Sequence, residues 1–220
     1  MRFHLRRPER PLIIAHRHGN RIAALPPGAD AIEADVWLYR GRHEVRHRKT
    51  MGPLPILWDR WELAPGWRHR PSLEELLDAL PADVPLLLDL KRLVDVEALR
   101  ALLERHQGRP LAVCSQYWGH LPAFEPLGIP IVYSLASEGQ LRRLPAALRG
   151  RRCDALSVHA RLLSYASVRR LRELAPALLS WPIGAWDVPW ALAFGLDGLI
   201  ADDPGAVAAA LDRCAGVHHA

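Results

Sequence analysis

Residues 31–37, Ala-Ile-Glu-Ala-Asp-Val-Trp, place carboxylates and apolar side chains at alternate positions. Successive residues of a β-strand point to opposite faces, so Glu33 and Asp35 share one face while Ile32 and Ala34 share the other. Buried carboxylates are costly unless they pair with cations or bind a metal. The stretch therefore predicts a buried strand whose polar face carries either a metal site or a set of ion pairs.

Seven other short apolar stretches, mostly bounded by Pro, Gly or Asp, alternate with helical patterns along the chain. With residues 31–37 they predict eight strands, at 11–15, 31–37, 85–90, 110–115, 129–134, 154–158, 177–181 and 197–201. Helices are expected at 72–80, 94–106, 141–148, 165–174 and 204–214, the third containing the helix breaker Pro145. This alternation predicts an α/β fold of the TIM (β/α)₈ barrel type. An open doubly wound sheet is the alternative, although no glycine-rich nucleotide loop supports it.

The composition indicates one globular domain over residues 1–220, because half of the chain is apolar. The same composition excludes an intrinsically disordered chain. The three cysteines are far apart, so we expect neither a disulfide framework nor a cysteine zinc site. The N-terminus lacks the apolar segment of a secretory signal, and no apolar stretch approaches the roughly 18 residues of a membrane span. We therefore expect a cytoplasmic protein with no transmembrane segment.

The chain is basic, with a net charge of +5, and only Lys49 and Lys91 of its 29 basic side chains are lysines. Basic chains can meet phosphoesters, phospholipid surfaces or nucleic acid, whereas scattered arginines can simply solvate a surface. The arginine runs fall on separate segments without interleaved aromatic residues, so we expect no nucleic-acid partner. One of the two lysines follows a predicted strand, which favours a specific role for Lys91.

A second predicted strand, 85–90, repeats the polar pattern, because Asp89 and Lys91 share one face. Both polar pairs lie at the carboxyl ends of their strands, where barrel active sites lie. Glu33, Asp35 and Asp89 would then form an oxygen-rich site for Mg²⁺ or Ca²⁺. A ring of salt bridges among these carboxylates, Lys91 and an arginine explains the pattern equally well.

Two histidines are placed to reach the same end of the barrel. His16 and Arg17 directly follow the first predicted strand, and His47 follows an extended piece at 43–46 that predicts a hairpin folding back over the mouth. A histidine pair beside a metal-bound phosphate can act as general acid and general base. Arg17 and Lys91 would neutralise phosphoryl oxygens. Loop histidines without a catalytic role are the alternative.

Seven short motifs occur in order along nearly the whole chain. They are Ile14-Ala15-His16-Arg17, Ala31-Ile32-Glu33-Ala34-Asp35-Val36, Val45-Arg46-His47, Leu88-Asp89-Leu90-Lys91, Cys114-Ser115-Gln116, Ser180-Trp181 and the segment Gly195–Pro204. Together they resemble the motifs of the glycerophosphodiester phosphodiesterases, in the phosphatidylinositol-phospholipase-C-like barrel superfamily. The resemblance implies a TIM barrel enzyme that hydrolyses glycerophosphodiesters to glycerol 3-phosphate and an alcohol.

The resemblance also implies a role for each of ten residues. They are catalytic His16 and His47, metal ligands Glu33, Asp35 and Asp89, phosphate-binding Arg17 and Lys91, and substrate-pocket residues Trp181, Ser115 and Asn20. In this family the glycerol 2-hydroxyl of the substrate can itself attack phosphorus and give a cyclic phosphate that water opens. No serine or cysteine nucleophile is then needed. For Trp181, a place in the plain barrel core is the alternative.

The chain departs from the family pattern after its first strand. The family's Pro-Glu-Asn-Thr box is missing, and Asn20 is a candidate replacement for its asparagine. Only residues 17–30 join the first two strands, close to the minimum of roughly 10–12 residues for such a crossover, so the first helix is expected to be a remnant. Arg48 follows His47 where the family has Asp, and Asp89 stands where it has Glu.

The insertion expected after the hairpin is reduced to about residues 50–70, a loop that contains Trp58, Trp61 and Trp67. These tryptophans would pack over the barrel edge or touch lipid. A lysophospholipase D-like or cyclising phospholipase of the same superfamily, with peripheral lipid contact, is therefore one alternative function. A degenerate barrel that binds a phosphoester without turnover is another. The alcohol, the choice between Mg²⁺ and Ca²⁺, and the oligomeric state stay open.

Overall fold

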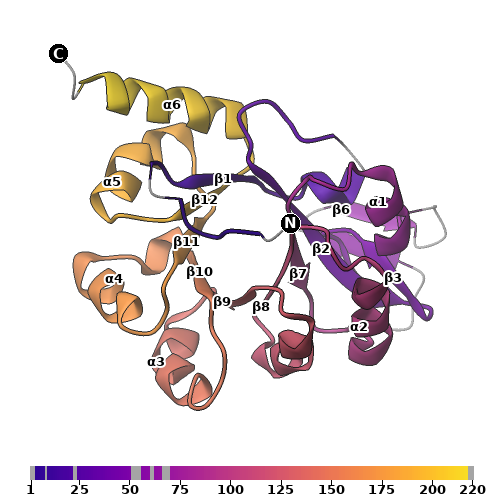
Figure 1. The fold of residues 1–220 in the computed structure, drawn as a ribbon. Helices are drawn as coiled ribbons and strands as arrows, with labels where there is room; N and C mark the ends of the chain where they lie inside the picture. The colour runs from indigo at the N-terminus through magenta and orange to yellow at the C-terminus, as the bar shows by residue number, and fades with distance from the viewer. Residues whose placement is uncertain are drawn as a thin grey trace.

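The computed structural model describes residues 3–7, 9–21, 24–50, 56–59, 62–65 and 70–217. Its centre is a barrel of eight parallel strands (Figure 1). The strands are β1 (Leu12–Ala15), β2 (Ala31–Tyr39), β7 (Leu86–Leu90), β8 (Leu111–Ser115), β9 (Ile131–Leu135), β10 (Ala155–His159), β11 (Leu178–Trp181) and β12 (Gly198–Ala201). Each strand pairs with the next, and β1 closes the ring by pairing with both β2 and β12. The predicted barrel and all eight predicted strands are confirmed.

Helices follow most of the barrel strands and cover its outside (Figure 1). They are α1 (Leu73–Ala79), α2 (Val96–Arg105), α3 (Glu138–Ala147), α4 (Tyr165–Arg172), α5 (Val188–Ala193) and α6 (Pro204–Val217). The five predicted helices are confirmed, and α5 is an addition whose six residues are too few to show helical periodicity. None of the described helices combines the length and the apolar character that crossing a membrane requires.

Proline has different effects at two places in the helical layer. Helix α3 continues through Pro145 instead of ending there, since Pro145 lies near its C-terminus and the buried Leu144 anchors that last turn. After β8, the segment Trp118–Leu127 forms 3₁₀ turns (η2), because Pro122 and Pro126 cannot donate the backbone hydrogen bonds that an α-helix needs.

The first crossover contains one 3₁₀ turn among its described residues, η1 (His18–Arg21), which confirms the predicted helix remnant. Its Gly19 lies directly against β2. A Cβ atom on Gly19 would come within 2.5 Å of the Ala34 Cβ atom, so only glycine allows this close approach.

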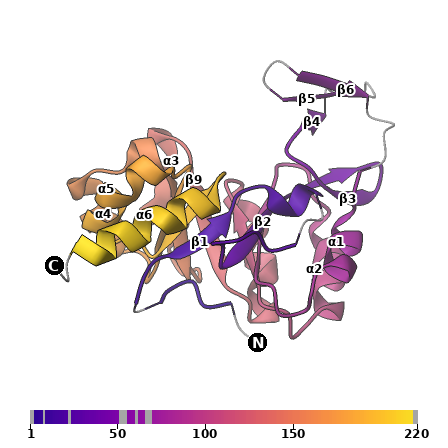
Figure 2. The same cartoon turned by 90° about the horizontal axis from the view of Figure 1, so that it is seen from above.

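A hairpin leaves β2 at the carboxyl end of the barrel. Strand β3 (Arg42–Val45) pairs antiparallel with β2 through a two-residue turn at Arg40-Gly41, whose φ angles of 50° and 76° are typical of a type I′ turn. A small antiparallel sheet follows, formed by β4 (Lys49–Thr50), β5 (Ile56–Asp59) and β6 (Glu62–Pro65), and it projects away from the barrel at the end opposite the N-terminus (Figure 2). Of the three tryptophans predicted there, Trp58 lies in β5 and is 37% exposed. Trp61 and Trp67 lie outside the described residues.

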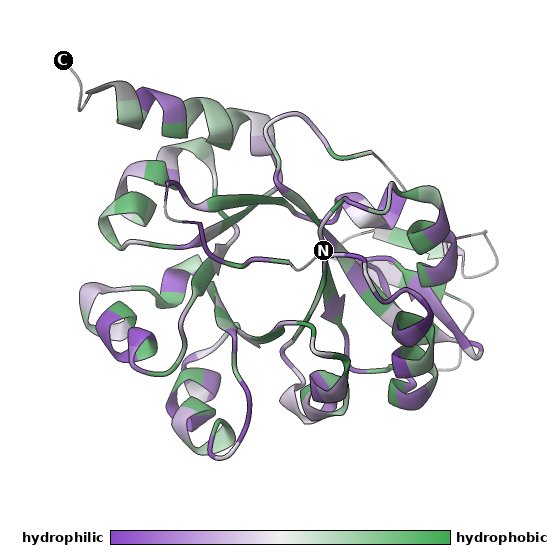
Figure 3. Cartoon of the chain, in the orientation of Figure 1, coloured by the Kyte–Doolittle hydropathy of each residue, from purple (hydrophilic) through white to green (hydrophobic). Residues whose placement is uncertain are grey.

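Alternate residues of the barrel strands form two separate apolar layers. Figure 3 shows that the barrel strands are mostly hydrophobic, whereas the helices around them have hydrophobic and hydrophilic residues. Outward-facing residues pack under the helices. Inward-facing residues such as Leu12, Leu87 and Leu179 fill the barrel. Phe3 and Leu5 belong to this inner layer, and their segment crosses the amino-terminal end of the barrel (Figure 1). The barrel is therefore closed by apolar packing at one end.

Three aspartates, each directly before a strand, clamp the same end of the barrel. Each accepts a hydrogen bond from a backbone amide of the neighbouring strand: Asp30 from Ile13 (2.9 Å), Asp154 from Ile131 (2.8 Å) and Asp197 from Leu178 (2.8 Å). Each is also paired with arginine: Asp30 with Arg7 and Arg10, Asp154 with Arg152, and Asp197 with Arg6 and Arg172. Part of the arginine excess thus has a structural role.

We expect Asp30→Asn to destabilise the protein by about 1.5–3 kcal/mol at neutral pH, since it weakens hydrogen bonds made to a charged group. Burial opposes ionisation, but the hydrogen bonds from Arg10 and the Ile13 amide outweigh it and lower the pKa of Asp30. The stabilisation is therefore present above the unfolded pKa of about 4 and is lost as the pH falls through the lower folded pKa. Urea unfolding of wild type and variant from pH 7 to pH 3 measures this difference. The exposed Asp212→Asn is the control, and an equal effect of both variants contradicts the prediction.

Candidate active site

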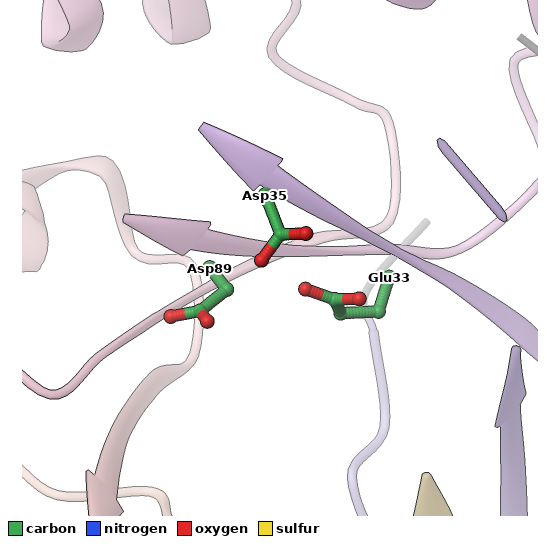
Figure 4. A group of neighbouring side chains, drawn as sticks. All are labelled: Glu33, Asp35 and Asp89. Atoms are coloured by element: carbon green, nitrogen blue, oxygen red, sulfur yellow. The ribbon is translucent and has the colours of Figure 1, made fainter. Parts of the chain in front are cut away.

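Three carboxylates meet at the carboxyl end of two neighbouring strands. Strand β2 carries Glu33 and Asp35, β7 carries Asp89, and the register places Asp35 directly opposite Asp89. One carboxylate oxygen from each of the three lies within 4.8 Å of the others, and Figure 4 shows the side chains turned toward one another. Glu33 and Asp35 are buried. The structure thus brings together the three carboxylates that the sequence predicted to meet at the carboxyl end of the barrel.

One cationic side chain and one backbone amide contact this cluster. The Lys91 ammonium lies between Asp35 and Asp89 and forms ion pairs with both. Glu33 instead accepts a hydrogen bond from the Arg17 backbone amide (2.6 Å). Arg17 has a φ of 60°, and this left-handed conformation is uncommon outside glycine and is often found at functional sites. Salt bridges, which the sequence allowed as an alternative to a metal site, are therefore present between Lys91 and two of the carboxylates. A single ammonium is nevertheless shared by a cluster of three carboxylates.

Burial and mutual repulsion shape the titration of the cluster. Burial, with the nearby Asp35 charge, raises the pKa of Glu33 to about 8, and burial also raises the pKa of Asp89. Burial opposes ionisation of Asp35 too, but Lys91 and His47 outweigh it and lower the pKa of Asp35. Burial disfavours the Lys91 charge, yet Asp35 and Asp89 raise the pKa of Lys91. The cluster therefore has more negative charge than its lysine neutralises.

This donor set fits a hard divalent cation. The Asp89 Oδ1 atom is buried and has no hydrogen-bond partner among the described residues. A buried carboxylate oxygen without a partner is costly, and coordination by a cation would remove that cost. Carboxylate oxygens are the ligands that Mg²⁺ and Ca²⁺ prefer. Glu33, Asp35 and Asp89 are therefore the residues that could hold such a metal.

His16 forms a dyad that the sequence did not predict. Its Nδ1 atom lies 2.7 Å from Oδ1 of Asp202, the residue directly after β12. Burial alone would lower the pKa of His16, but the hydrogen bond to Asp202 and the Glu33 charge outweigh it and raise that pKa. The position of Asp202 at the carboxyl end of a predicted strand was the signal that could have identified it.

Two adjoining cavities meet at the histidines. A cavity of about 230 Å³ reaches into the barrel beside the carboxylates, and His16, Arg17, His47, Lys91 and Trp181 all line it. A second cavity, of about 610 Å³, lies on the hairpin side and is also lined by His16, Arg17 and His47. The structure therefore gathers both histidines and both predicted phosphate-binding residues around one opening.

Several residues of the smaller cavity were not predicted. Ser134 and Ser157, opposite each other on β9 and β10, are buried and line it, and so do Lys49, Gln116 and Tyr117. The strand alternation that identified the carboxylates also points Ser134 and Ser157 inward. Trp181 lines the same cavity, with its ring edge-on to His159 at 4.7 Å between centroids.

Two of the three predicted pocket residues, Ser115 and Asn20, make hydrogen bonds within the protein. Ser115 is fully buried in the barrel wall, where its hydroxyl donates to the Leu90 carbonyl (2.6 Å) and accepts from the Tyr117 amide (2.9 Å). Asn20 makes two hydrogen bonds to Asp35: its Nδ2 donates to the Asp35 carboxylate (2.8 Å), and its Oδ1 accepts from the Asp35 backbone amide (2.9 Å). Asn20 lies at the edge of the larger cavity. A polar side chain can form a hydrogen bond with nearby backbone as readily as with a substrate. A single sequence does not show which of the two it does.

Solved structures with the same architecture exist, although no protein-family model and no curated protein matches the chain. An Oleispira antarctica phosphodiesterase in complex with the product sn-glycerol-3-phosphate superposes with a TM-score of 0.70 at 18% identity, over 92% of this chain and 97% of that one. The chain has the fold of the glycerophosphodiester phosphodiesterases. The Thermotoga maritima enzyme of that name gives 0.67 at 19% identity, over 90% and 97%. A Silicibacter pomeroyi protein assigned as a glycerophosphoryl diester phosphodiesterase gives 0.71 at 18% identity, over 96% of both chains.

We expect Asp202→Asn to lower the pKa of His16, because the variant removes a negative charge and an acceptor that favour the imidazolium. The pKa of His16 can be read by NMR titration of the ring protons in the protein kept metal-free with EDTA. Asp203→Asn, at the next position along the chain, is the matched control and should leave the His16 titration unchanged. An unchanged His16 titration in Asp202→Asn contradicts the assignment of the dyad.

Proposed function

We propose that the protein is a glycerophosphodiester phosphodiesterase, a metal-dependent hydrolase that releases glycerol 3-phosphate and an alcohol. The observation that carries the proposal is the convergence of three carboxylates with His16 and His47 at one opening of the barrel. The shared fold, including that of a phosphodiesterase in complex with sn-glycerol-3-phosphate, supports it. Every chemical role that phosphodiester hydrolysis needs has a candidate residue at this opening.

The phosphate would be bound by charge from several sides. Glu33, Asp35 and Asp89 would hold Mg²⁺ or Ca²⁺, which when bound supplies positive charge to the phosphoryl oxygens. Arg17 and Lys91 line the same cavity and would contact the remaining oxygens. Lys91 can serve in this way because a cation among the carboxylates would take over its present role as their counter-ion.

The two histidines would transfer the protons. Asp202 raises the pKa of His16, so the imidazolium form persists to higher pH and suits donation of a proton to the leaving alcohol oxygen. His47 would accept the proton of the attacking hydroxyl, from the glycerol 2-hydroxyl or from water. The glycerol end would lie deeper in the barrel, where the hydroxyls of Ser134 and Ser157 and the ring of Trp181 line the cavity.

Hydrolysis of glycerophosphocholine with added Mg²⁺ or Ca²⁺ tests the proposed activity. We expect turnover that EDTA abolishes and that His47→Ala lowers by about 10²- to 10⁴-fold, the usual contribution of a general acid or base. His106→Ala, at the end of α2 far from the opening, is the control variant. Wild-type protein that binds glycerol 3-phosphate but hydrolyses no diester would support the degenerate barrel instead, and unchanged activity in His47→Ala would remove His47 from the mechanism.

Metal binding should become more stabilising as the pH rises. In the metal-free protein, the pKa of Glu33 is about 8 when folded against 4.5 for the ordinary group, so its protonated form gives stability that is present below the unfolded pKa and lost as the pH rises through about 8. A cation competes with that proton. We therefore expect the increase in Tm on adding Mg²⁺ or Ca²⁺ to be larger at pH 8.5 than at pH 6. Glu33→Gln should abolish this pH dependence and the exposed Glu97→Gln should keep it; a shift that is equal at both pH values contradicts the prediction.

One observation favours a lipid substrate as the second candidate function. Trp186 is 95% exposed, Tyr165 is 74% exposed and Tyr117 is 45% exposed, and each lies in the segment that follows the carboxyl end of a barrel strand. Aromatic side chains with a polar edge are favoured at membrane interfaces. Hydrolysis confined to lysophosphatidylcholine, with none of glycerophosphocholine, would establish the lysophospholipase D-like alternative.

A further inference from the structure

The larger of the two cavities is strongly cationic. It measures about 610 Å³ and opens beside the proposed catalytic centre, with which it shares His16, Arg17 and His47. Five arginines line it: Arg17, Arg21, Arg46, Arg48 and Arg70. Asp202 is the one carboxylate among its described lining residues, and it is bound to His16. Among its described lining residues, the cavity therefore has five arginines and one carboxylate.

Arg46 is a buried arginine in the wall of this cavity. It lies in the strand-like segment that leads to His47 and is only 4% exposed. Its Nε atom donates to Glu44 (2.8 Å), and its guanidinium stacks over the rings of Trp37 and Tyr39 at 5.3 and 5.6 Å. Its Nη2 atom is nevertheless buried without a hydrogen-bond partner in the described part of the chain. A buried donor of a charged group in this state is costly. The Nη2 atom is enclosed by the protein, so Arg46 would attract an anion in the cavity through its charge and not through a hydrogen bond from this atom.

The position of the cavity relates it to one end of the substrate. The smaller cavity reaches inward between the barrel strands and suits the glycerol end, whereas His16 and His47 stand at the boundary of both cavities. The alcohol that leaves from phosphorus would extend from these histidines into the larger cavity. Guanidinium groups bind phosphate and carboxylate oxygens with paired hydrogen bonds.

We propose that the arginine-lined cavity binds an anionic group, a phosphate or a carboxylate, carried by the leaving alcohol of the substrate. The inference rests on the proposed function and adds a preference, among its substrates, for diesters whose alcohol is itself acidic. Arg21 and Arg70 line the cavity and supply charge that a neutral or cationic alcohol such as choline would not use.

The test compares glycerophosphoinositol with glycerophosphoinositol 4-phosphate, which differ by one phosphate on the leaving alcohol. We expect kcat/KM to be at least about tenfold higher for the phosphorylated diester, as for charge-assisted hydrogen bonds. The double variant Arg21→Gln/Arg70→Gln should bring the ratio of the two kcat/KM values close to one. Arg100→Gln, on α2 and paired there with Glu97, is the matched control and should keep the wild-type ratio.

A binding measurement separates this inference from the proposed activity. Isothermal titration calorimetry in EDTA, with the same two diesters, should show at least about tenfold tighter binding of the phosphorylated one to wild type and equal binding of both to the double variant. If neither diester is hydrolysed, the proposed function fails and this binding ratio alone decides the inference. A ratio near one in wild type overturns the inference. Wild-type protein that binds inorganic phosphate but shows no preference between the two diesters also overturns the inference. The cavity would then bind a free anion and not a group on the leaving alcohol.

Discussion

The packing of three carboxylates, two of them buried, around one ammonium is the constraint on which the rest of the opening depends. The direct pairing of Asp35 with Asp89 across β2 and β7 fixes where the charges meet. The surrounding groups stabilise those charges. Lys91 forms ion pairs with Asp35 and Asp89, and Asn20 donates a hydrogen bond to the Asp35 carboxylate. The shortage of positive charge around the three carboxylates suits a divalent cation, while Asp202 raises the pKa of His16.

The opposite end of the barrel uses charge in a different way. There each aspartate that precedes a strand is fully engaged by a neighbouring backbone amide and by arginine, and apolar side chains of the N-terminal segment close the interior. Such satisfied carboxylates stabilise a fold but leave no capacity for a ligand. The aspartate of the closing Asp197-Gly198 motif belongs to this group, so its place in a family motif reflects strand pairing. Its Gly198 is structural too, because a Cβ there would lie 2.4 Å from a methyl group of Leu179.

The sequence was sufficient for those features that follow from local periodicity. Short apolar runs bounded by Pro, Gly or Asp identified the eight strands, and alternation of period two identified the shared face of Glu33 and Asp35. The shortness of the first crossover predicted η1 as a remnant. Features that depend on contacts between distant segments could not be predicted. Asp202 meets His16 across 186 positions of sequence. Ser115 shows the converse, since a position that matched a family motif carries a hydroxyl used for a backbone bond inside the wall.

The closure of the barrel also has a consequence for how the protein acquires its site. Strand β1, which leads directly to His16, has four register pairs with β12 but only two with β2. Of the eight barrel strands, β1 is synthesised first, and it is thus held mainly by β12, which is synthesised last. Contacts of such high sequence separation form late, because the intervening loop must be closed before they contribute. On the ribosome, the carboxylate half of the opening on β2 and β7 can assemble early, while His16 reaches its place only after β12 has emerged.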